Sequence, residues 1–224
     1  MKRNLTKLLT LFLFTFSISV ISQTQAVTTE GDTIYVYKNG TWSYELLDEM
    51  PVINELDYLD AELKIDTIQT AFKFSDKTDK EIINANDQFR IKYNGQQWKR
   101  VPPATLNDDA EFAFESKSSD IWCVVISEDT PIEKDKLFKI ARRTMEENSG
   151  SDSEIIKTEL INVNGAEVLR GVLNVNFSGI SFVFDSYYFS NEKGSVQFTT
   201  WTSTEVWKRT EQDIQDFLYG FVVD

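Results

Sequence analysis

Four consecutive segments of alternating apolar and polar residues, joined by tight-turn sequences, constrain the fold of this chain more than any other feature. The period of two is that of a strand with one buried face. Asn164-Gly165 and Ser178-Gly179 separate the first three segments, and a turn sequence ending at Gly194 precedes the fourth. Such sequences favour short hairpin turns, so the segments predict an antiparallel sheet. They span residues 154–163, 167–177, 180–190 and 195–203.

Shorter strands are expected before this region. Asn94-Gly95 turns the chain between the first two of them, and a polar segment joins the other two. Cys123, the one cysteine of the chain, lies in the last of these strands, where we expect it to be a buried core residue. The expected strands are residues 88–93, 97–101, 111–115 and 121–127.

Two helices with apolar stripes are expected to pack on this sheet. The first opens with a capping box in which Thr130 is the N-cap and Glu133 the N3 residue, and Gly150 ends it. The second has Thr210 at its N-cap and continues to the end of the chain. Its apolar stripe has helical spacing and consists of Ile214, Phe217, Leu218, Phe221 and Val222.

The order of elements over residues 86–224 is therefore ββββ-α-ββββ-α. It predicts an α+β fold, an antiparallel sheet of about eight strands with helices packed on it. The motif from Phe89 to Tyr93 with Trp98, the capped helix, the hairpin around Asn164-Gly165 and the C-terminal helix together resemble the PsbP-like α/β/α sandwich fold. Members of that family serve mainly as non-enzymatic binding modules. The resemblance implies a binding function, and no functional residue is carried over from it.

Residues 1–26 have the layout of a secretory signal peptide. Three basic residues precede the apolar stretch 8–21, and small residues follow it. Cleavage is expected either after Ser22 or after Ala26, and the sequence leaves both sites open. The exit region has no cysteine for lipid attachment, and no later segment approaches about 18 consecutive apolar residues. We therefore expect a periplasmic or secreted protein without a membrane span.

Two further segments lie between the signal peptide and the sandwich domain. Residues 27–50 are expected to form a β-hairpin around Asn39-Gly40. The sequence Gly40-Thr-Trp-Ser-Tyr44 resembles a short segment found in exported bacterial proteins of unknown function. Residues 51–85 are expected to be an acidic linker, with one further strand near 65–74 as an option.

Charge and histidine content narrow the function classes. The formal net charge is −13, from 36 acidic and 23 basic residues, which disfavours binding to nucleic acid or an anionic membrane and suits a basic protein partner. Histidine is absent, so the commonest general base and the commonest zinc ligand are missing. We expect no enzyme activity, no cofactor and no metal, although acidic clusters such as Asp108-Asp109 leave calcium binding open.

The function expected from these observations is that of an exported, non-catalytic binding or accessory module of the bacterial cell envelope that recognises a protein partner. Tyr187 and Trp201 are the candidate contact residues, because exposed aromatic side chains often dominate binding surfaces. Burial in the core is the other interpretation of both residues. Two alternatives remain: a glycan-binding module, which requires Tyr187 and Trp201 to be exposed and adjacent, and a hydrolase with two carboxylates about 5–10 Å apart.

Overall fold

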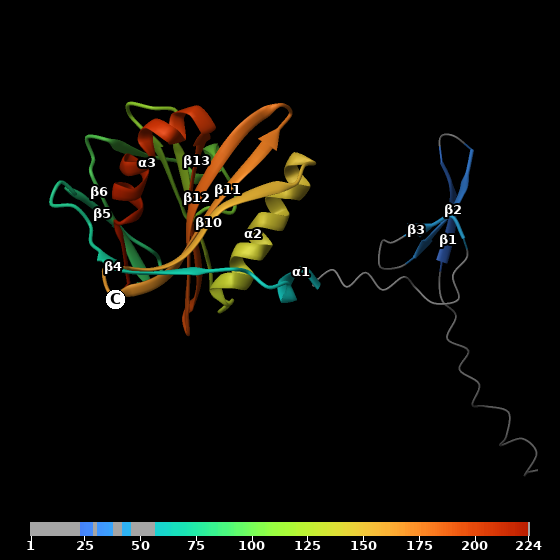
Figure 1. Cartoon of the computed structure of the whole chain (residues 1–224), viewed down its shortest axis with the longest axis horizontal. Helices are drawn as coiled ribbons and strands as arrows, with labels where there is room; N and C mark the ends of the chain where they lie inside the picture. The colour runs from blue at the N-terminus through green and yellow to red at the C-terminus, as the bar shows by residue number, and fades with distance from the viewer. Residues whose placement is uncertain (1–22, 29–30, 38–41, 46–56, 224) are drawn as a thin grey trace, which may run out of the picture. The chain divides into compact units, whose positions relative to one another are not determined.

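The computed structural model describes residues 23–28, 31–37, 42–45 and 57–223 (Figure 1). The chain divides into two compact units, Met1–Asp57 and Tyr58–Asp224. The first unit holds one small sheet, and the second unit holds two sheets and the long helices.

The first unit is a three-stranded antiparallel sheet in the order β1-β2-β3. β2 and β3 are the strands of the expected hairpin, whose Asn39-Gly40 turn lies outside the described residues. The sequence did not predict β1, because its residues fall in the expected exit region of the signal peptide. The strands are β1 (Gln23–Val27), β2 (Thr33–Tyr37) and β3 (Trp42–Ser43).

The second unit is built on an eight-stranded sheet with the order β4-β10-β11-β12-β13-β9-β8-β7 (Figure 1). β4 runs parallel to β10, and the other neighbouring strands are antiparallel. This sheet confirms the predicted fold class. Its strands are β4 (Asp66–Phe72), β7 (Trp98–Val101), β8 (Phe112–Ser116), β9 (Trp122–Glu128), β10 (Ser153–Val163), β11 (Ala166–Phe177), β12 (Ile180–Asn191) and β13 (Gly194–Ser203).

Tight turns link the four long strands, as predicted. Asn164 and Gly165 both have positive φ angles, 52° and 91°. Two consecutive left-handed residues are the geometry of a type I′ turn, whose twist matches that of the flanking strands. Glycine is favoured at the second position because a side chain there would be strained. The four strands therefore form a meander in which sequence neighbours pair.

Two helices and the second small sheet cover the main sheet (Figure 1). α2 (Lys134–Ser149) packs on one face, and α3 (Thr204–Leu218) packs on the opposite face together with the sheet β14-β6-β5. The unit is thus a three-layered sandwich. The remaining elements are α1 (Asp57–Asp60), β5 (Lys80–Ile83), β6 (Phe89–Tyr93), the 3-10 helix η1 (Pro103–Thr105) and β14 (Phe221–Val223).

Each face of the main sheet has its own hydrophobic cluster. On the α2 face, the ring of Phe138 meets that of Tyr188 edge-on, with centroids 5.5 Å apart. On the α3 face, Phe217 stacks on Trp98 with centroids 3.8 Å apart. Cys123 is fully buried in this second cluster, as predicted, and burial raises the pKa of its thiol.

The predicted start of the first helix is wrong. α2 begins at Lys134, its N-cap is Glu133, and no side chain caps it. The Thr130 carbonyl oxygen instead accepts a hydrogen bond from Ser195 Oγ at 3.0 Å, which ties this segment to β13. A tertiary contact therefore overrides the local capping signal. Gly150 ends the helix in the left-handed conformation, as predicted.

The last helix begins and ends earlier than predicted. Ser203 is its N-cap, and the Ser203 hydroxyl oxygen accepts a hydrogen bond from the Val206 N–H. Thr210 lies inside the helix, where its hydroxyl donates to the Val206 carbonyl oxygen. The helix ends at Leu218, and Phe221 begins β14 instead of continuing the apolar stripe. The edge of the second sheet binds these last residues in extended form.

The sandwich domain also starts earlier than the predicted boundary at residue 86. β4 confirms the optional strand near 65–74, and β5 lies in the segment 51–85 that was otherwise expected to be a linker. β4 takes the eighth place in the main sheet, and β6, which was expected there, belongs to the second sheet. Most side chains of β4 are exposed, so this edge strand lacks the apolar alternation that reveals a strand in a sequence.

Candidate functional site

A groove between α2 and the main sheet is the candidate site. Its floor is formed by β9 and β13, and its walls are formed by α2 and by the residues that follow η1. Its volume is ≈ 340 Å³. We call it the α2 groove. The residues used below to describe it are Asn107, Asp109, Thr144, Met145, Asn148, Phe177, Phe184, Gln197, Thr199 and Trp201.

A row of aromatic rings crosses the sheet at this groove. The centroids of Phe177 and Phe184 are 6.1 Å apart, those of Phe184 and Trp201 are 6.4 Å apart, and those of Trp201 and Trp122 are 6.3 Å apart. All four side chains are partly exposed. We call these four residues the aromatic row. It presents ring faces of the kind that bind sugars, peptide side chains or other apolar groups.

Strand register explains the aromatic row. Phe184 of β12 lies opposite Trp201 of β13, which in turn lies opposite Trp122 of β9. Residues directly opposite each other in antiparallel strands point to the same face of the sheet. The hairpin turn therefore fixes which rings stand side by side.

Neutral polar side chains accompany the rings. Thr199 is only 7% exposed, and Gln197 is half-buried beside it on β13. Neither side chain, nor that of Asn148 on α2, makes a hydrogen bond within the part of the chain that the structure describes. Buried polar groups normally have a partner. The groove thus combines aromatic surface with hydrogen-bonding groups that remain available to a ligand.

The structure separates the two predicted contact residues. Trp201 lies in the α2 groove, whereas Tyr187 is only 1% exposed and lies on the α3 face. Tyr187 pairs with Phe198, whose side chain points away from the α2 groove. Burial raises the pKa of the Tyr187 hydroxyl well above its ordinary value. The prediction that Tyr187 and Trp201 form one exposed platform is therefore wrong, because β12 and β13 place the two side chains on opposite faces of the sheet.

Sequence reasoning missed Phe177, Phe184 and Trp122 as partners of Trp201. The turn sequence did contain the needed signal. A two-residue turn between Asn191 and Gly194 sets the register of the whole hairpin, and this register places Phe184 opposite Trp201. The position of Trp122 beside Trp201 could not be predicted, because β9 and β13 are far apart in the sequence and no turn between them sets their register.

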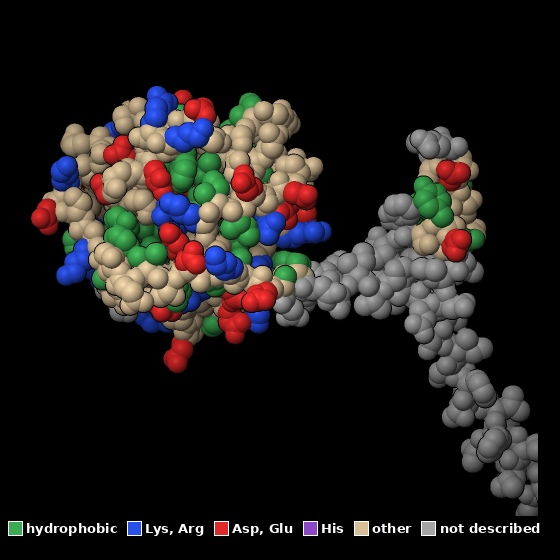
Figure 2. Space-filling model, in the orientation of Figure 1, with side chains coloured by type: hydrophobic (Ala, Val, Ile, Leu, Met, Phe, Trp, Pro, Cys, Tyr) green, Lys and Arg blue, Asp and Glu red, His purple; other side chains and the backbone are tan. Residues whose placement is uncertain are grey.

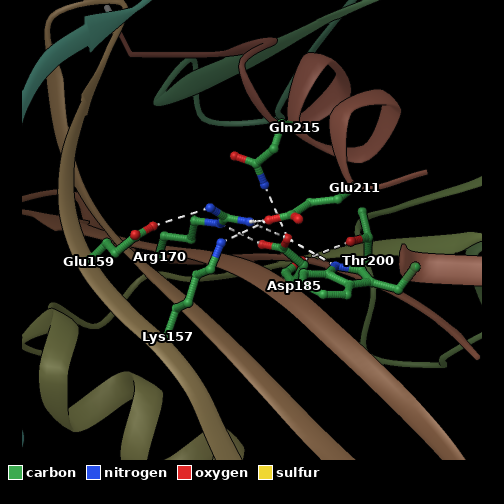
Figure 3. A network of polar contacts seen from close by, with 8 residues as sticks. Lys157, Glu159, Arg170, Asp185, Thr200, Glu211 and Gln215 are labelled. Atoms are coloured by element: carbon green, nitrogen blue, oxygen red, sulfur yellow. Dashed lines mark hydrogen bonds and ion pairs between the residues drawn. The ribbon is translucent and has the colours of Figure 1, made fainter. Parts of the chain in front are cut away.

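A buried ionic network lies on the other face of the main sheet, beneath α3 (Figure 3). Arg170 donates two hydrogen bonds to the fully buried Asp185, at 2.9 Å to Oδ1 and 2.7 Å to Oδ2. The same guanidinium contacts Glu159 at 3.1 Å and Glu211 at 3.3 Å. Burial lowers the pKa of Arg170, but the bond to Asp185 outweighs it, so the net shift is upward.

Further contacts complete this network (Figure 3). The Asp185 carboxylate also accepts a hydrogen bond from Gln215 Nε2 at 3.1 Å, and Lys157 contacts Glu211 at 2.9 Å. The carboxylates that converge here are thus paired with cations and amide groups. They link strands of the sheet to α3.

A metal site would require several acidic side chains to lie close together. Among the described residues, no group of three or more Asp, Glu, Cys or His side chains is placed to hold a metal ion. Glu111 accepts hydrogen bonds from the Ala85 N–H and the Ser127 hydroxyl. Basic and acidic side chains are interspersed on the face of the second unit shown in Figure 2. The excess negative charge therefore forms no single-sign patch on that face.

A second cavity, with a volume of ≈ 650 Å³, lies near the N-terminal end of α2. It is larger than the α2 groove, and two of its charged side chains, Lys134 and Glu167, bind each other at 2.6 Å. Its lining contains no aromatic ring among the described residues. The α2 groove is the better candidate because aromatic rings lie beside unpaired polar side chains in its lining. None of the helices in the described part of the chain has the length and apolarity needed to cross a membrane.

Comparisons with known proteins identify the fold. No family model and no curated protein sequence matches the chain. The solution structure of cyanobacterial PsbP (CyanoP) from Synechocystis sp. PCC 6803 aligns with 70% of this chain and 99% of its own, with a TM-score of 0.51 and 13% identity. The chain has the PsbP-like fold. At this identity, the PsbP-like fold alone is shown.

Other solved structures are similar at lower scores. The Ran-binding protein Mog1p of Saccharomyces cerevisiae has a TM-score of 0.45 and 10% identity, covering 64% of this chain and 94% of its own. A protein of unknown function from Pseudomonas aeruginosa, PA94, has a TM-score of 0.37 and 11% identity, covering 58% of this chain and 88% of its own. A PsbP-like fold does not by itself define a function.

Proposed function

We propose that this protein is an exported, non-catalytic binding module of the bacterial cell envelope, and that its α2 groove receives an apolar side chain of a protein partner. The observation that carries the proposal is the open aromatic groove of ≈ 340 Å³ next to Trp201. Concave apolar surface with a few polar groups is typical of binding sites. Export is supported by the signal-peptide layout of residues 1–26.

The charge of the groove favours a basic partner. Asp109 is the one charged residue among the described residues of its lining, and it is exposed. The whole chain has a formal net charge of −13. In a partner with an arginine or lysine beside a large apolar residue, the basic side chain would contact Asp109 and the apolar side chain would contact the aromatic rings of the groove. Gln197 and Thr199 would then bond main-chain groups of the partner.

A glycan is the second candidate ligand. The observation that favours it is the combination of the partly exposed Trp201 ring with the unpaired side chains of Gln197 and Asn148. Ring faces stack on sugar rings, and neutral amides bond sugar hydroxyls. This form of the hypothesis depends on the aromatic row and no longer involves Tyr187.

A groove-filling variant tests the proposal. Thr144→Trp places a large side chain at the exposed edge of α2 that lines the groove, and Arg143→Trp is the matched control on the same helix. Each variant is incubated with envelope extract and then crosslinked to the proteins that it binds, and each is separately applied to a glycan array. We expect Thr144→Trp to lose one specific protein partner that Arg143→Trp keeps. Equal capture by both variants would contradict the proposal, and loss of array binding alone would select the glycan.

A further inference from the structure

The N-terminal strand bears on how the chain is processed. β1 consists of Gln23–Val27, and all five residues pair with β2, from Gln23 opposite Tyr37 to Val27 opposite Thr33. The hairpin is closed by Thr28, whose hydroxyl oxygen accepts a hydrogen bond from the Asp32 N–H at 3.1 Å. β1 and β2 thus form the longest strand pair of the first unit.

The two possible signal-peptide cleavage sites affect this strand differently. Cleavage after Ala26 would leave only Val27 of β1 in the mature chain. The remaining sheet would be β2 and β3, with only Tyr35 opposite Ser43 and Val36 opposite Trp42. Such a short isolated pair is not stable in water. Cleavage after Ser22 leaves all five residues of β1 in place.

The positions of the two bonds in the fold favour the same site. The Ala26–Val27 bond lies inside the ladder, where Ala26 is opposite Ile34 and Val27 is opposite Thr33. A mature chain that begins at Val27 would lack four of the five paired residues of β1. A mature chain that begins at Gln23 keeps the whole ladder, because Gln23 is its first paired residue. Both sites have a small residue before the bond, so the sequence alone does not choose between them.

We infer that signal peptidase cleaves the chain after Ser22 and that the mature protein begins with Gln23, the first residue of β1. The inference rests on the export that is part of the proposed function. In the reaction, one water molecule is consumed as the amide bond between Ser22 and Gln23 breaks. Ser22 keeps the new carboxylate, and Gln23 keeps the new amine.

The experiment is to express the full chain in a Gram-negative bacterium and to identify its N-terminus by intact mass and by sequencing of the N-terminal peptide. We expect Gln23, either as the free amine or cyclised with loss of ammonia. A mature chain that begins at Val27 would overturn the inference while leaving export intact. A chain that stays uncut in the cytoplasm would overturn export itself, and the inference with it.

Two variants separate the sites. Ser22→Tyr removes the small residue at the inferred site, and we expect it to abolish or slow processing. Ala26→Tyr removes the small residue at the other site, and tyrosine is well tolerated in strands, so we expect the start at Gln23 to be unchanged. The opposite pattern, in which only Ala26→Tyr blocks processing, would overturn the inference.

Discussion

Phe184 and Trp201 lie directly opposite each other on β12 and β13, with ring centroids 6.4 Å apart and ring planes inclined by 21°. This pair forms the centre of the aromatic row and lies in the α2 groove. Because helix α2 leaves both rings partly exposed, they remain available for contact with another molecule. The binding hypothesis depends on this pair more than on any other feature.

Removal of the indole should weaken binding strongly. We expect Trp201→Ala to cost about 2 kcal/mol of binding free energy, which is roughly a 30-fold increase in Kd, since buried aromatic anchors dominate binding surfaces. Trp201→Phe should keep most of the affinity. The measurement is a binding titration with the captured partner, after a thermal melt shows that each variant is folded.

Ile83→Ala is the matched control for this test. Ile83 is 43% exposed and belongs to β5 in the second sheet, on the opposite side of the main sheet from the α2 groove. Its substitution should leave the Kd unchanged. A similar loss of affinity in Ile83→Ala and Trp201→Ala would show that the groove has no special role.

Substitutions of Arg170 and Asp185 should have strongly non-additive effects on the free energy of unfolding. Asp185→Leu removes the carboxylate that accepts two bonds from a guanidinium with only 7% of its side chain exposed. We expect each single variant, Asp185→Leu or Arg170→Met, to lower the free energy of unfolding by about 3–5 kcal/mol, because a buried charge loses its main partner of opposite charge. The double variant should be more stable than the sum of the single effects predicts. Urea unfolding of all four proteins gives the coupling energy, and strict additivity would contradict this account.

The Glu146 carboxyl should make stability depend on pH. Burial raises its pKa, but hydrogen bonds from Ser153 and the neighbouring Arg142 outweigh that effect, so the net pKa lies below the ordinary value of 4.5. A carboxyl with a lowered pKa in the folded state stabilises the fold at pH values above 4.5. This contribution is lost as the pH falls through the folded-state pKa.

The corresponding measurement is urea unfolding as a function of pH. The wild-type chain should lose stability between neutral pH and about pH 3, and Glu146→Gln should lose less over the same range. Because other carboxyls also titrate there, the difference between the two proteins is the quantity to compare. Parallel curves for the two proteins would show that Glu146 makes no such contribution.

Gly171 should be intolerant of even a methyl group. A Cβ atom at this position would lie 2.5 Å from two ring carbons of Phe138, a buried residue of α2 that packs on the main sheet. We expect Gly171→Ala to destabilise the fold by about 1–3 kcal/mol through overpacking. The double variant Gly171→Ala with Phe138→Leu should recover part of the loss that Phe138→Leu alone causes. Thermal and urea unfolding measure both effects. A Gly171→Ala variant as stable as wild type would contradict the expected clash between the new methyl group and the Phe138 ring.

The central meander was predictable because its signals are local. The alternation of residues 154–203 and the turns at Asn164-Gly165 and Ser178-Gly179 specify strands, order and pairing without distant information. The fold class followed from these signals. The pairing of Phe184 with Trp201 was equally encoded in the turn before Gly194.

Features that depend on distant partners were not predictable. A strand near 65–74 was an option in the sequence, but its place beside β10 in the main sheet was not predictable, and residues from Phe221 onward become a strand only because β6 lies beside them. The start of α2 moves because Ser195 binds the Thr130 carbonyl. The burial of Tyr187 follows from α3 packing on that face. In each of these cases a long-range contact outweighs the local propensity.

The most direct test of the binding account is site-specific photo-crosslinking in cells. A photoreactive side chain is placed at Asn148, which lines the α2 groove, or at the neighbouring Glu147, which is exposed on α2 outside it. The account predicts one dominant envelope protein crosslinked through position 148, absent at 147 and lost when Trp201→Ala is added. Equal crosslinking from both positions, or a crosslink at 148 that survives Trp201→Ala, would contradict the claim that the groove binds a partner.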